Sequence, residues 1–477
     1  MKSLFRYELK FLFGAKLTYG LLLLLFVLIS YSVSTRQNKI RAYRATVDSL
    51  YNKQWADVNT YKKKLDSVIT FRVKESYLRQ SPKNPYSLVF NIPLYAIFPV
   101  DERAIISTGQ SDVFANYFVN NDDWKNPVIT QETPTTPFQQ LFGVVDLAFV
   151  LVYLLPIIII AFSFNLVSSE REQGTLQMLL VLPRPLITIF LLKTTIRLLL
   201  VYTTVVAATL SSFWINGVSF LHHLPALWIF LGVVFLYSSF WFLLALFINL
   251  KGRSSGANAV MLLSAWLFFL LILPVILNMT ISSAFPAPSR LAYTSTFWKI
   301  SNENEKQERN EVLDKFYQDH PELVLKQDTL SENKEWSQLF EFYKWVLAST
   351  EDMSRKIQPV LESYSSSAKK RTRLANSFRF LSPSIVMQDE LDNLAGTSTA
   401  DYQRFFIQSE NSRKVFSAML RKKIFEEQFV NEADLDKVAS LIRRSSYQPV
   451  FSWANILSLL LYVSVLACLL GFSQKWE

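Results

Sequence analysis

The sequence predicts a mainly α-helical, polytopic membrane protein. Half of its 477 residues are hydrophobic, yet the mean hydropathy is only +0.19, so the apolar residues must be concentrated in blocks. Six blocks reach the length of about 20 apolar residues that a helix needs to cross a bilayer. Between these blocks, apolar residues recur at helical spacing over long stretches. The expected spans cover residues 17–35, 142–167, 186–215, 226–250, 257–284 and 450–472.

Residues 1–16 precede the first span, and we expect them to form an amphipathic helix in the membrane interface. Apolar residues such as Leu4, Phe5 and Leu9 are interleaved with Arg6 and Lys10, which would meet anionic head groups. The alternative is a flank that only helps to set the orientation. The first span has a long apolar core and no small-residue cleavage site after it, so we do not expect it to be a signal peptide.

The short loops predict the orientation, because basic residues collect on the cytoplasmic side. Lys and Arg precede the first span, lie between spans two and three and between four and five, and follow the sixth. The short loop at 216–225 has none. Both termini are therefore expected in the cytoplasm, and the long segments 36–141 and 285–449 are expected outside it.

The first outer segment, 36–141, is predicted to be a mixed domain. Apolar residues recur at helical spacing from 37 to 78 without a Gly or Pro, which favours a long helix, or a helix pair, rising directly from span one. Four prolines from Pro82 to Pro99 then divide short aromatic and β-branched pieces. That pattern indicates irregular structure or strands.

The second outer segment, 285–449, is predicted to be mostly helical, and its size is that of an independent domain. Breaks are expected at Pro321, Pro383 and Gly396. The expected helices cover 303–319, 332–365, 369–380 and 401–427.

The cytoplasmic connection 168–185 between spans two and three combines charge with an apolar face. It reads Glu-Arg-Glu-Gln-Gly-Thr-Leu from Glu170 to Leu176, and Pro183 and Lys193 follow. Carboxylates favour a helix N-terminus, while a face of Leu and Met can bury in the groove of a partner. The alternative is an ordinary capped surface helix.

This connection, with the interfacial helix and the six spans, resembles the membrane subunit, or permease, of ABC-2-type transporters. Its Glu-Arg-Glu-x-Gly-Thr-Leu-x-x-Leu-Leu carries the resemblance. In that family the connection forms a coupling helix that sits in a groove of the ATP-binding subunit. The resemblance implies that the ATPase is contacted by Glu170, Arg171, Glu172, Gly174, Thr175 and Leu176.

The resemblance also implies partners, location and function. Two cytosolic ABC ATP-binding subunits and a second permease chain, identical or related, would form an exporter in the bacterial inner membrane, in contact with lipid. The chain has no Gly-x-x-x-x-Gly-Lys-Ser/Thr, so it is expected to be no enzyme and to carry no cofactor, with ATP and Mg bound on the partner ATPase. Two alternatives remain: an ABC-type complex that transports nothing and acts mechanically on an extracytoplasmic partner, and a membrane-anchored receptor without an ATPase.

A second resemblance lies near the end of the second outer segment. It is carried by Leu381-Ser382-Pro383-Ser384, Leu394-Ala395-Gly396-Thr397-Ser398, Tyr402-x-x-Phe405-Phe406 and Arg413. These residues look like a segment of ABC-2 permeases that have large extracytoplasmic insertions. The resemblance implies an architecture and leaves the cargo open.

Polar residues within the spans are candidates for a substrate path. Asp146 either faces a central cavity or a subunit interface, or it stays hydrated near the head groups, which we favour. Lys193 and Arg197 are expected to extend toward the cytoplasmic surface. Pro156 and Pro274 are candidate kinks. The net charge of +10 is spread over both sides and predicts no nucleic-acid partner, and His222, His223 and His320 have no metal-binding spacing.

Overall fold

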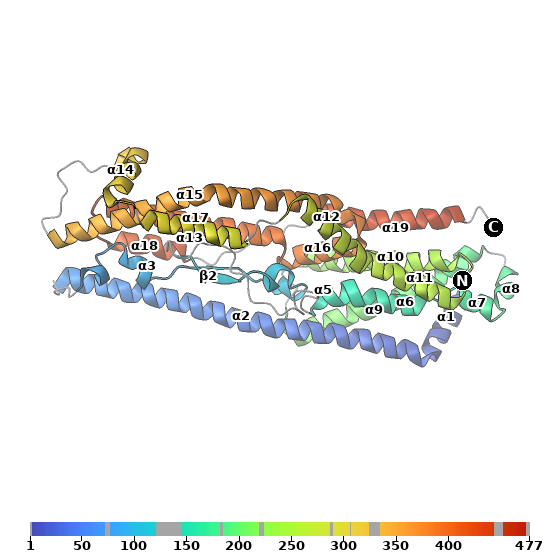
Figure 1. Ribbon diagram of the computed structural model, residues 1–477. Coiled ribbons are helices and arrows are strands. Elements are labelled where there is room, and N and C mark those ends of the chain that lie inside the picture. Colours follow the sequence, from blue (N-terminus) through green and yellow to red (C-terminus); the bar gives the residue numbers. More distant parts are fainter. Residues whose placement is uncertain are drawn as a thin grey trace.

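The computed structural model describes residues 2–71, 77–120, 145–181, 185–218, 224–286, 290–305, 307–323, 334–442 and 452–473. The fold is mainly α, at 83% helix, and the described residues include six helices that are long and apolar enough to cross a membrane. The prediction of a multi-pass helical membrane protein is thus confirmed by helix length and hydropathy. Figure 1 shows an elongated molecule, with the spans and both chain termini toward one end.

The spans agree with the predicted blocks, except that the first continues far beyond the membrane segment. Helix α10 is central: it packs against α6, α9, α11 and α19, because it is apolar on all faces. Its Tyr237 Oη donates to the Val152 carbonyl at 2.9 Å. The spans are α2 (Lys16–Phe71), α5–η4–α6 (Leu147–Ser163), α9 (Leu186–Ile215), α10 (Leu224–Asn249), α11–η6–α12 (Ser255–Ala284) and α19 (Trp453–Ser473).

The two candidate kinks are π-helical turns. The turns η4 (Val150–Leu154) and η6 (Phe268–Ile272) each end directly before a helix whose second residue is Pro156 or Pro274. Proline has no N–H and its ring crowds the preceding turn, and one wider turn relieves the crowding. In η6 the Leu273 amide bonds to the Phe268 carbonyl, and the next amide would be that of Pro274. The Phe269 carbonyl is therefore left without its helical donor.

Helix α2 is a single helix of 56 residues, about 84 Å long at 1.5 Å per residue. It runs from the membrane part into the outer part without interruption, as the blue helix of Figure 1 shows. The predicted long helix is confirmed, and it is one helix rather than a pair. No Pro or Gly after Gly20 breaks it. The separate helix α1 (Lys2–Gly14) precedes it.

The two outer segments share one apolar core, although the sequence favoured two domains. We call the described residues of 37–120 and 290–442 the outer body. Tyr61 of α2, Ile92, and Phe340 and Phe416 from the second segment belong to the same buried cluster. Tyr86 stacks on Tyr343 with ring centroids 4.4 Å apart. Each segment thus supplies part of a core that the other completes.

The first outer segment contains the expected strand structure, as a two-stranded antiparallel sheet. Strand β1 (Tyr95–Ile97) pairs antiparallel with β2 (Tyr117–Val119), and Ala96 lies opposite Phe118. The short elements around it are η1 (Leu78–Gln80), α3 (Ser87–Asn91), η2 (Glu102–Ile105) and η3 (Gly109–Asp112).

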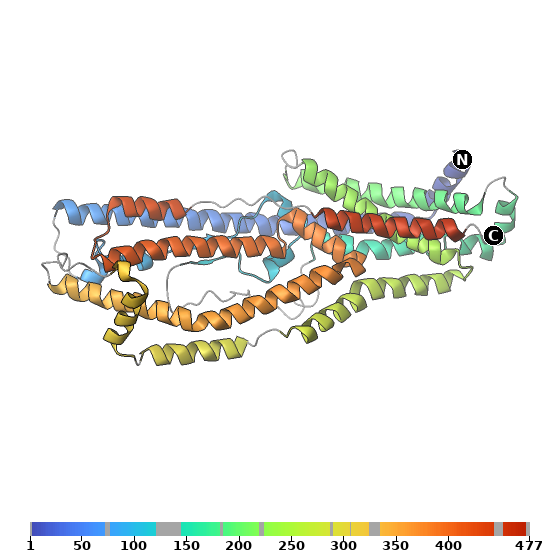
Figure 2. The ribbon, with the colours of Figure 1, turned by 90° about the horizontal axis from the view of Figure 1, so that it is seen from above.

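The second segment is helical, but the predicted helix boundaries were partly wrong. The two helices expected between 332 and 380 are one helix, since Ser-Ser-Ser-Ala before Lys369 has no strong breaker and Pro359 is accommodated inside it. The helix expected at 303–319 is divided, and Pro383 begins a helix that was missed. The elements are α13 (Arg290–Glu305), α14 (Arg309–Asp319), η7 (Pro321–Leu323), α15 (Lys334–Phe378), η8 (Arg379–Leu381), α16 (Pro383–Ala395), α17 (Thr399–Phe425) and α18 (Glu432–Leu441). Figure 2 shows α13 and α15 along one side of the outer body.

His320, after α14, lies between two carboxylates of the outer body. Its Nδ1 lies 3.1 Å from Glu322 and its Nε2 2.7 Å from Glu351. Glu351 chiefly raises the pKa of His320 above 6.5, while partial burial and Arg421 oppose this. The stability contributed by protonated His320 is therefore complete below its unfolded pKa and is lost as pH rises through the raised folded value.

We expect His320→Gln to lower the unfolding temperature at about pH 6 and to have little effect at about pH 9. Thermal unfolding of the purified chain in detergent, scanned against pH, measures this. Equal curves for the variant and the wild type at both pH values would contradict the described ion pairs.

Candidate functional site

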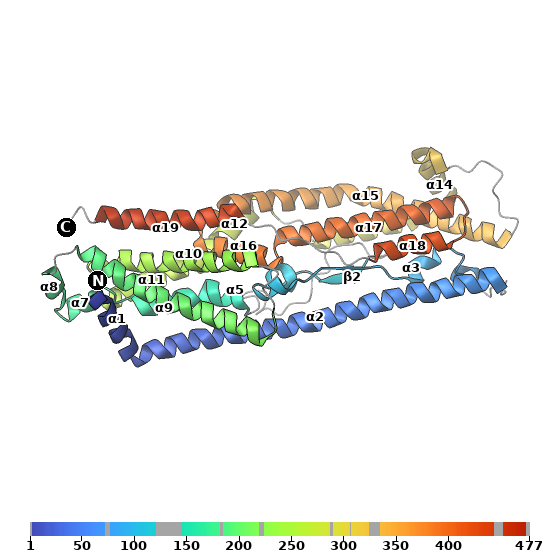
Figure 3. The ribbon, with the colours of Figure 1, turned by 180° about the vertical axis from the view of Figure 1, so that it is seen from behind.

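The connection between spans two and three is a pair of short helices at the end of the molecule where both termini lie (Figure 3). Helix α7 covers Ser168–Glu172 and α8 covers Leu176–Leu180. The turn between them has Gly174 at φ +77°, which favours glycine. We call residues 168–181 the α7–α8 loop. Pro183 and Arg184, which the sequence placed in the same connection, lie outside the described residues.

The inner side of the α7–α8 loop is tied to span three and to α1. Glu170 forms an ion pair with Lys193 of α9 and accepts a hydrogen bond from Thr175 Oγ1. Lys193 Nζ also lies 3.8 Å from Glu8 of α1. These contacts connect three elements that are distant in the sequence.

Arg197, one turn further along α9, completes this charged cluster. Its guanidinium lies 2.9 Å from Glu8 and donates to the Phe162 carbonyl at 2.5 Å. The expectation that Lys193 and Arg197 extend to the surface is wrong, because both are buried. Buried cations need carboxylate partners, and Glu8 and Glu170 balance the two positive charges.

The same loop is tied to the beginning of span five. Glu172 accepts from the backbone amide of Ser255 at 2.7 Å and from its hydroxyl at 2.8 Å. Ser255 is the first residue of α11, so the carboxylate lies at a helix N-terminus, where negative charge is favourable. The Ser168 and Ser255 hydroxyls are 2.8 Å apart. Asn249, at the end of α10, reinforces the joint by donating to the Ser163 carbonyl at 3.0 Å.

The outer side of the loop exposes apolar side chains. Met178 is 75% exposed and Val181 is 84% exposed. Leu176 and Leu179 instead pack inward against the cluster around Phe190. Met178 and Val181 were not among the predicted contact residues. Their signal was present, as apolar residues on the helix face opposite the buried leucines.

The six predicted contact residues divide between the two sides of the loop. Arg171, Glu172 and Gly174 are exposed, and the Arg171 guanidinium lies beside Gly252 in the loop between spans four and five. The others are half-buried and face inward: Glu170, Thr175 and Leu176.

Asp146 has a different environment from the one favoured by the sequence. It is buried and is the N-cap of α5, accepting from the Phe149 amide at 2.8 Å. Its second oxygen accepts from the Thr108 amide at 2.6 Å. The interpretation as a hydrated residue is therefore wrong. Asp146 joins the beginning of span two to the outer body, and its place on a substrate path stays a prediction.

The residues of the second resemblance gather where the outer body meets the spans. Ser382 and Ser384 both donate to the Phe269 carbonyl, at 2.8 and 2.9 Å, and so replace the donor that Pro274 lacks. Tyr402 stacks on Phe98 with ring centroids 4.1 Å apart. These side chains attach α16 to span five and the second outer segment to the first.

The residues around Ser107 complete this junction. Ser107 Oγ donates to Asp392 of α16 at 2.5 Å. Thr397 Oγ1 donates to the Ser107 carbonyl at 3.3 Å, and the Gln110 amide donates to the Thr397 carbonyl at 2.9 Å. Residues 107–110, whose Thr108 amide donates to Asp146, are thus also bound to α16.

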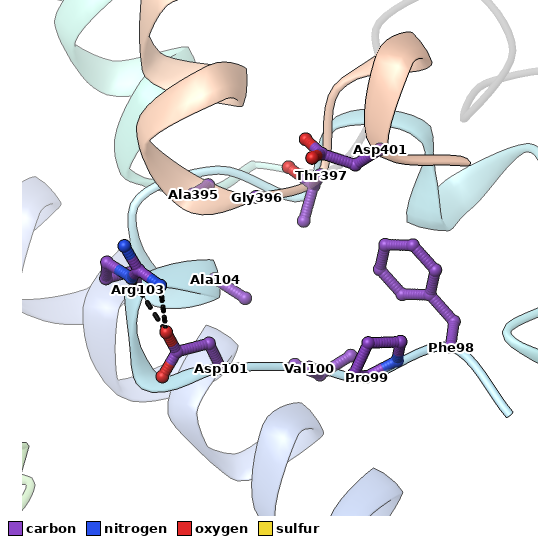
Figure 4. A pocket seen from close by; sticks show the side chains of 10 residues that line it. All are labelled: Phe98, Pro99, Val100, Asp101, Arg103, Ala104, Ala395, Gly396, Thr397 and Asp401. Atoms are coloured by element: carbon purple, nitrogen blue, oxygen red, sulfur yellow. Dashed lines mark hydrogen bonds and ion pairs between the residues drawn. The ribbon is translucent and has the colours of Figure 1, made fainter. Parts of the chain in front are cut away.

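Two small cavities lie in the outer body. The first encloses about 20 Å³ beside Arg103 and Asp101, which are ion-paired, and is large enough for a single water (Figure 4). The second encloses about 190 Å³ between β1 and α17, and no charged residue lines it. Among the described residues, no group of three or more His, Cys, Asp or Glu is arranged to hold a metal ion. His222 and His223 lie outside the described residues.

Fold, helix length and hydropathy together define the chain as a multi-pass membrane protein. Residues 290–440, which contain α13 to α17 and nearly all of α18, match a family described as a domain of unknown function, DUF3526. No curated protein matches the chain, and no solved structure matches it.

Proposed function

We propose that the chain is the permease subunit of an ABC-2-type exporter, driven by ATP hydrolysis on a separate cytosolic subunit. The observation that carries the proposal is the α7–α8 loop, whose outer side exposes Met178 and Val181 while its inner side is bonded to two other elements, α9 and α11. An exposed apolar anchor beside charged residues suits a protein interface. The resemblance of this loop to the coupling helix of ABC-2 permeases agrees with that use.

The contacts of the α7–α8 loop suggest how a movement of the ATPase would be transmitted to the spans. Glu172 connects the loop to α11, and Glu170 connects it to α9 through Lys193. A displacement of the loop would therefore move the ends of spans two, three and five together. The partner ATPase would bind ATP and Mg, and the α7–α8 loop of this chain would transmit the movement to the spans.

A second candidate function is favoured by the junction at α16. Ser382 and Ser384 bind the π-turn of span five, and Arg371 of α15 donates to Ser282 of α12 at 3.2 Å. Motion of span five would reach the outer body directly through these bonds. The chain would then act as a mechanical transmitter or assembly factor on an extracytoplasmic partner. A continuous cavity between two copies of the spans would favour export, and a tightly packed interface would favour transmission.

We expect Met178→Asp to weaken binding of the ATP-binding subunit by about tenfold or more, because a charge replaces an exposed apolar anchor. Copurification from native membranes and the ATPase rate of the complex in nanodiscs measure the effect. Met178 is a cleaner choice than Glu172, which also holds Ser255.

The matched control is Phe90→Asp, since Phe90 is 70% exposed on α3 of the outer body. It should leave binding and ATPase rate unchanged. If Met178→Asp binds the ATPase as the wild type does, the loop is not the docking site. If no ABC ATPase copurifies with the wild-type chain, the proposed function itself fails.

A further inference from the structure

Glu390 of α16 and Asn455 of α19 form a fully buried polar pair, each with 0% exposure. The Asn455 Nδ2 donates to Glu390 Oε2 at 2.9 Å and to Asp389 Oδ2 at 2.8 Å. Two oxygens of the pair have no partner among the described residues, Glu390 Oε1 and Asn455 Oδ1. Buried acceptors without a donor are costly, so the described residues leave this site short of one hydrogen-bond donor.

Reversing the amide of Asn455 does not supply the missing donor. Its two N–H groups already serve Asp389 and Glu390. In the reversed orientation, the amide oxygen would face two carboxylates and both bonds would be lost. The shortage of donors among the described residues is therefore independent of the orientation of the Asn455 amide.

The two adjacent carboxyl groups differ in their charge partners. Asp389 is 2.6 Å from the Arg379 guanidinium, whereas Glu390 has no ion pair with any described residue. Burial, followed by the charge of Asp389, raises the pKa of Glu390 to about 7, although Asn455, the Ser452 amide and Arg379 oppose the rise. When one of two adjacent carboxyl groups is paired with a cation, a proton is favoured on the other carboxyl group.

The other elements that pack against α16 supply no cation to Glu390. Helices α10 and α19 and the turn η6 contain no charged residue. On η2, Arg103 is paired with Asp101. The remaining titratable groups on these elements, on η4 and on α16 itself are Glu102, which lies 3.9 Å from Arg44, and Tyr153, Tyr237, Asp392, Tyr462 and Cys468.

We propose that Glu390 binds a proton on Oε1 and donates it to Oδ1 of Asn455, so that the two side chains form a cyclic acid–amide pair. One proton then satisfies both orphaned oxygens and removes a buried charge. The pair joins α16, at the base of the outer body, to the last span. It is a proton-binding site that stands independently of the proposed coupling to an ATPase.

Deprotonation would weaken this joint. A carboxylate at Glu390 would face Asp389 and would leave the Asn455 oxygen without a donor. For a carboxyl whose folded pKa is raised, stability falls as pH rises from the unfolded value to the folded one, here from about 4.3 to about 7. Above that window the contribution is constant.

Infrared difference spectroscopy of the full chain in lipid nanodiscs, between acidic and alkaline buffer, tests the proposal. We expect a C=O band of a protonated carboxyl that titrates near pH 7 and is lost in Glu390→Gln. The glutamine can donate to Asn455 Oδ1 permanently, so the variant should also lose part of the alkaline destabilisation. Because Asp392 also has a pKa raised to about 7, the comparison is made in an Asp392→Asn background. There, a band that persists in Glu390→Gln, or no band at acidic pH, would overturn the assignment.

Asp392→Asn is the matched control, because burial also raises the pKa of Asp392 to about 7. It should leave the Glu390 band in place. Asn455→Leu keeps Glu390 but removes its amide partner, and it should move the band to higher frequency. An unmoved band would mean that Glu390 does not bond to Asn455. A thermal stability that depends on Na⁺ rather than on pH would mean that a metal cation occupies the site in place of the proton.

Discussion

Glu8→Ala is expected to destabilise the chain by about 3–5 kcal/mol, the cost of leaving a buried charge uncompensated. Glu8 of α1 lies 2.9 Å from Arg197 and 3.8 Å from Lys193, and all three side chains are buried. Lys193 would retain Glu170, but Arg197 would keep only the Phe162 carbonyl among the described residues. The unfolding temperature in detergent, followed by a fluorescent size-exclusion signal, measures the loss.

The matched control is Lys10→Ala, an exposed charge on the same helix. It should change the unfolding temperature little. A double variant, Glu8→Leu with Arg197→Met, should recover much of the loss, since apolar residues of similar volume replace a buried ion pair well. Equal behaviour of Glu8→Ala and Lys10→Ala would mean that α1 does not dock on span three as described.

The spans and the long helix α2 could be predicted because their signals are local. A block of apolar residues is sufficient for a span, and an uninterrupted helical period is sufficient for α2. The charged cluster is different in kind. Glu8 and Arg197 are 189 positions apart, and nothing in the neighbourhood of Arg197 in the sequence indicates its partner. Because a lysine and an arginine lie near the end of an apolar block, their side chains were expected to extend to the surface.

The outer body shows the same limit. Tyr86 and Tyr343 stack across segments that the membrane spans separate in the sequence, so two segments of domain size suggested two domains. Some missed features had local signals. Ser382 followed by Pro383 is a helix start, and Asn431 and Asp434 form a capping box before α18.

In the candidate site, the sequence predicted the α7–α8 loop, but it did not predict which side chains of the loop face inward and which are exposed. The motif placed Glu170 and Glu172 together, yet one faces Lys193 and the other faces Ser255. Which face of a helix five residues long is exposed depends on the spans around it. Asp146 likewise became a helix cap because Thr108, from another part of the chain, lies next to it.

Gly109→Ala is expected to destabilise the junction between the two outer segments. Gly109 has φ +49°, and a Cβ there would lie 2.4 Å from the Thr397 carbonyl oxygen. That carbonyl cannot easily move, because the Gln110 amide donates to it and Thr397 is itself bonded to Ser107. Backbone strain costs about 1–3 kcal/mol, and forced overpacking adds about 1–3 kcal/mol.

Gly396→Ala separates these two causes. Gly396 also has a positive φ, of +69°, but a Cβ there meets nothing within 4 Å. It should show the backbone strain alone, so Gly109→Ala should lower stability further by about 1–3 kcal/mol. Thermal unfolding of both variants in the same detergent measures the difference. The excess arises only from contact between Gly109, next to the Thr108 that binds Asp146, and the turn after α16. Equal losses would therefore mean that these two parts of the chain do not touch. The connection from span two to the outer body would then have to run through other residues.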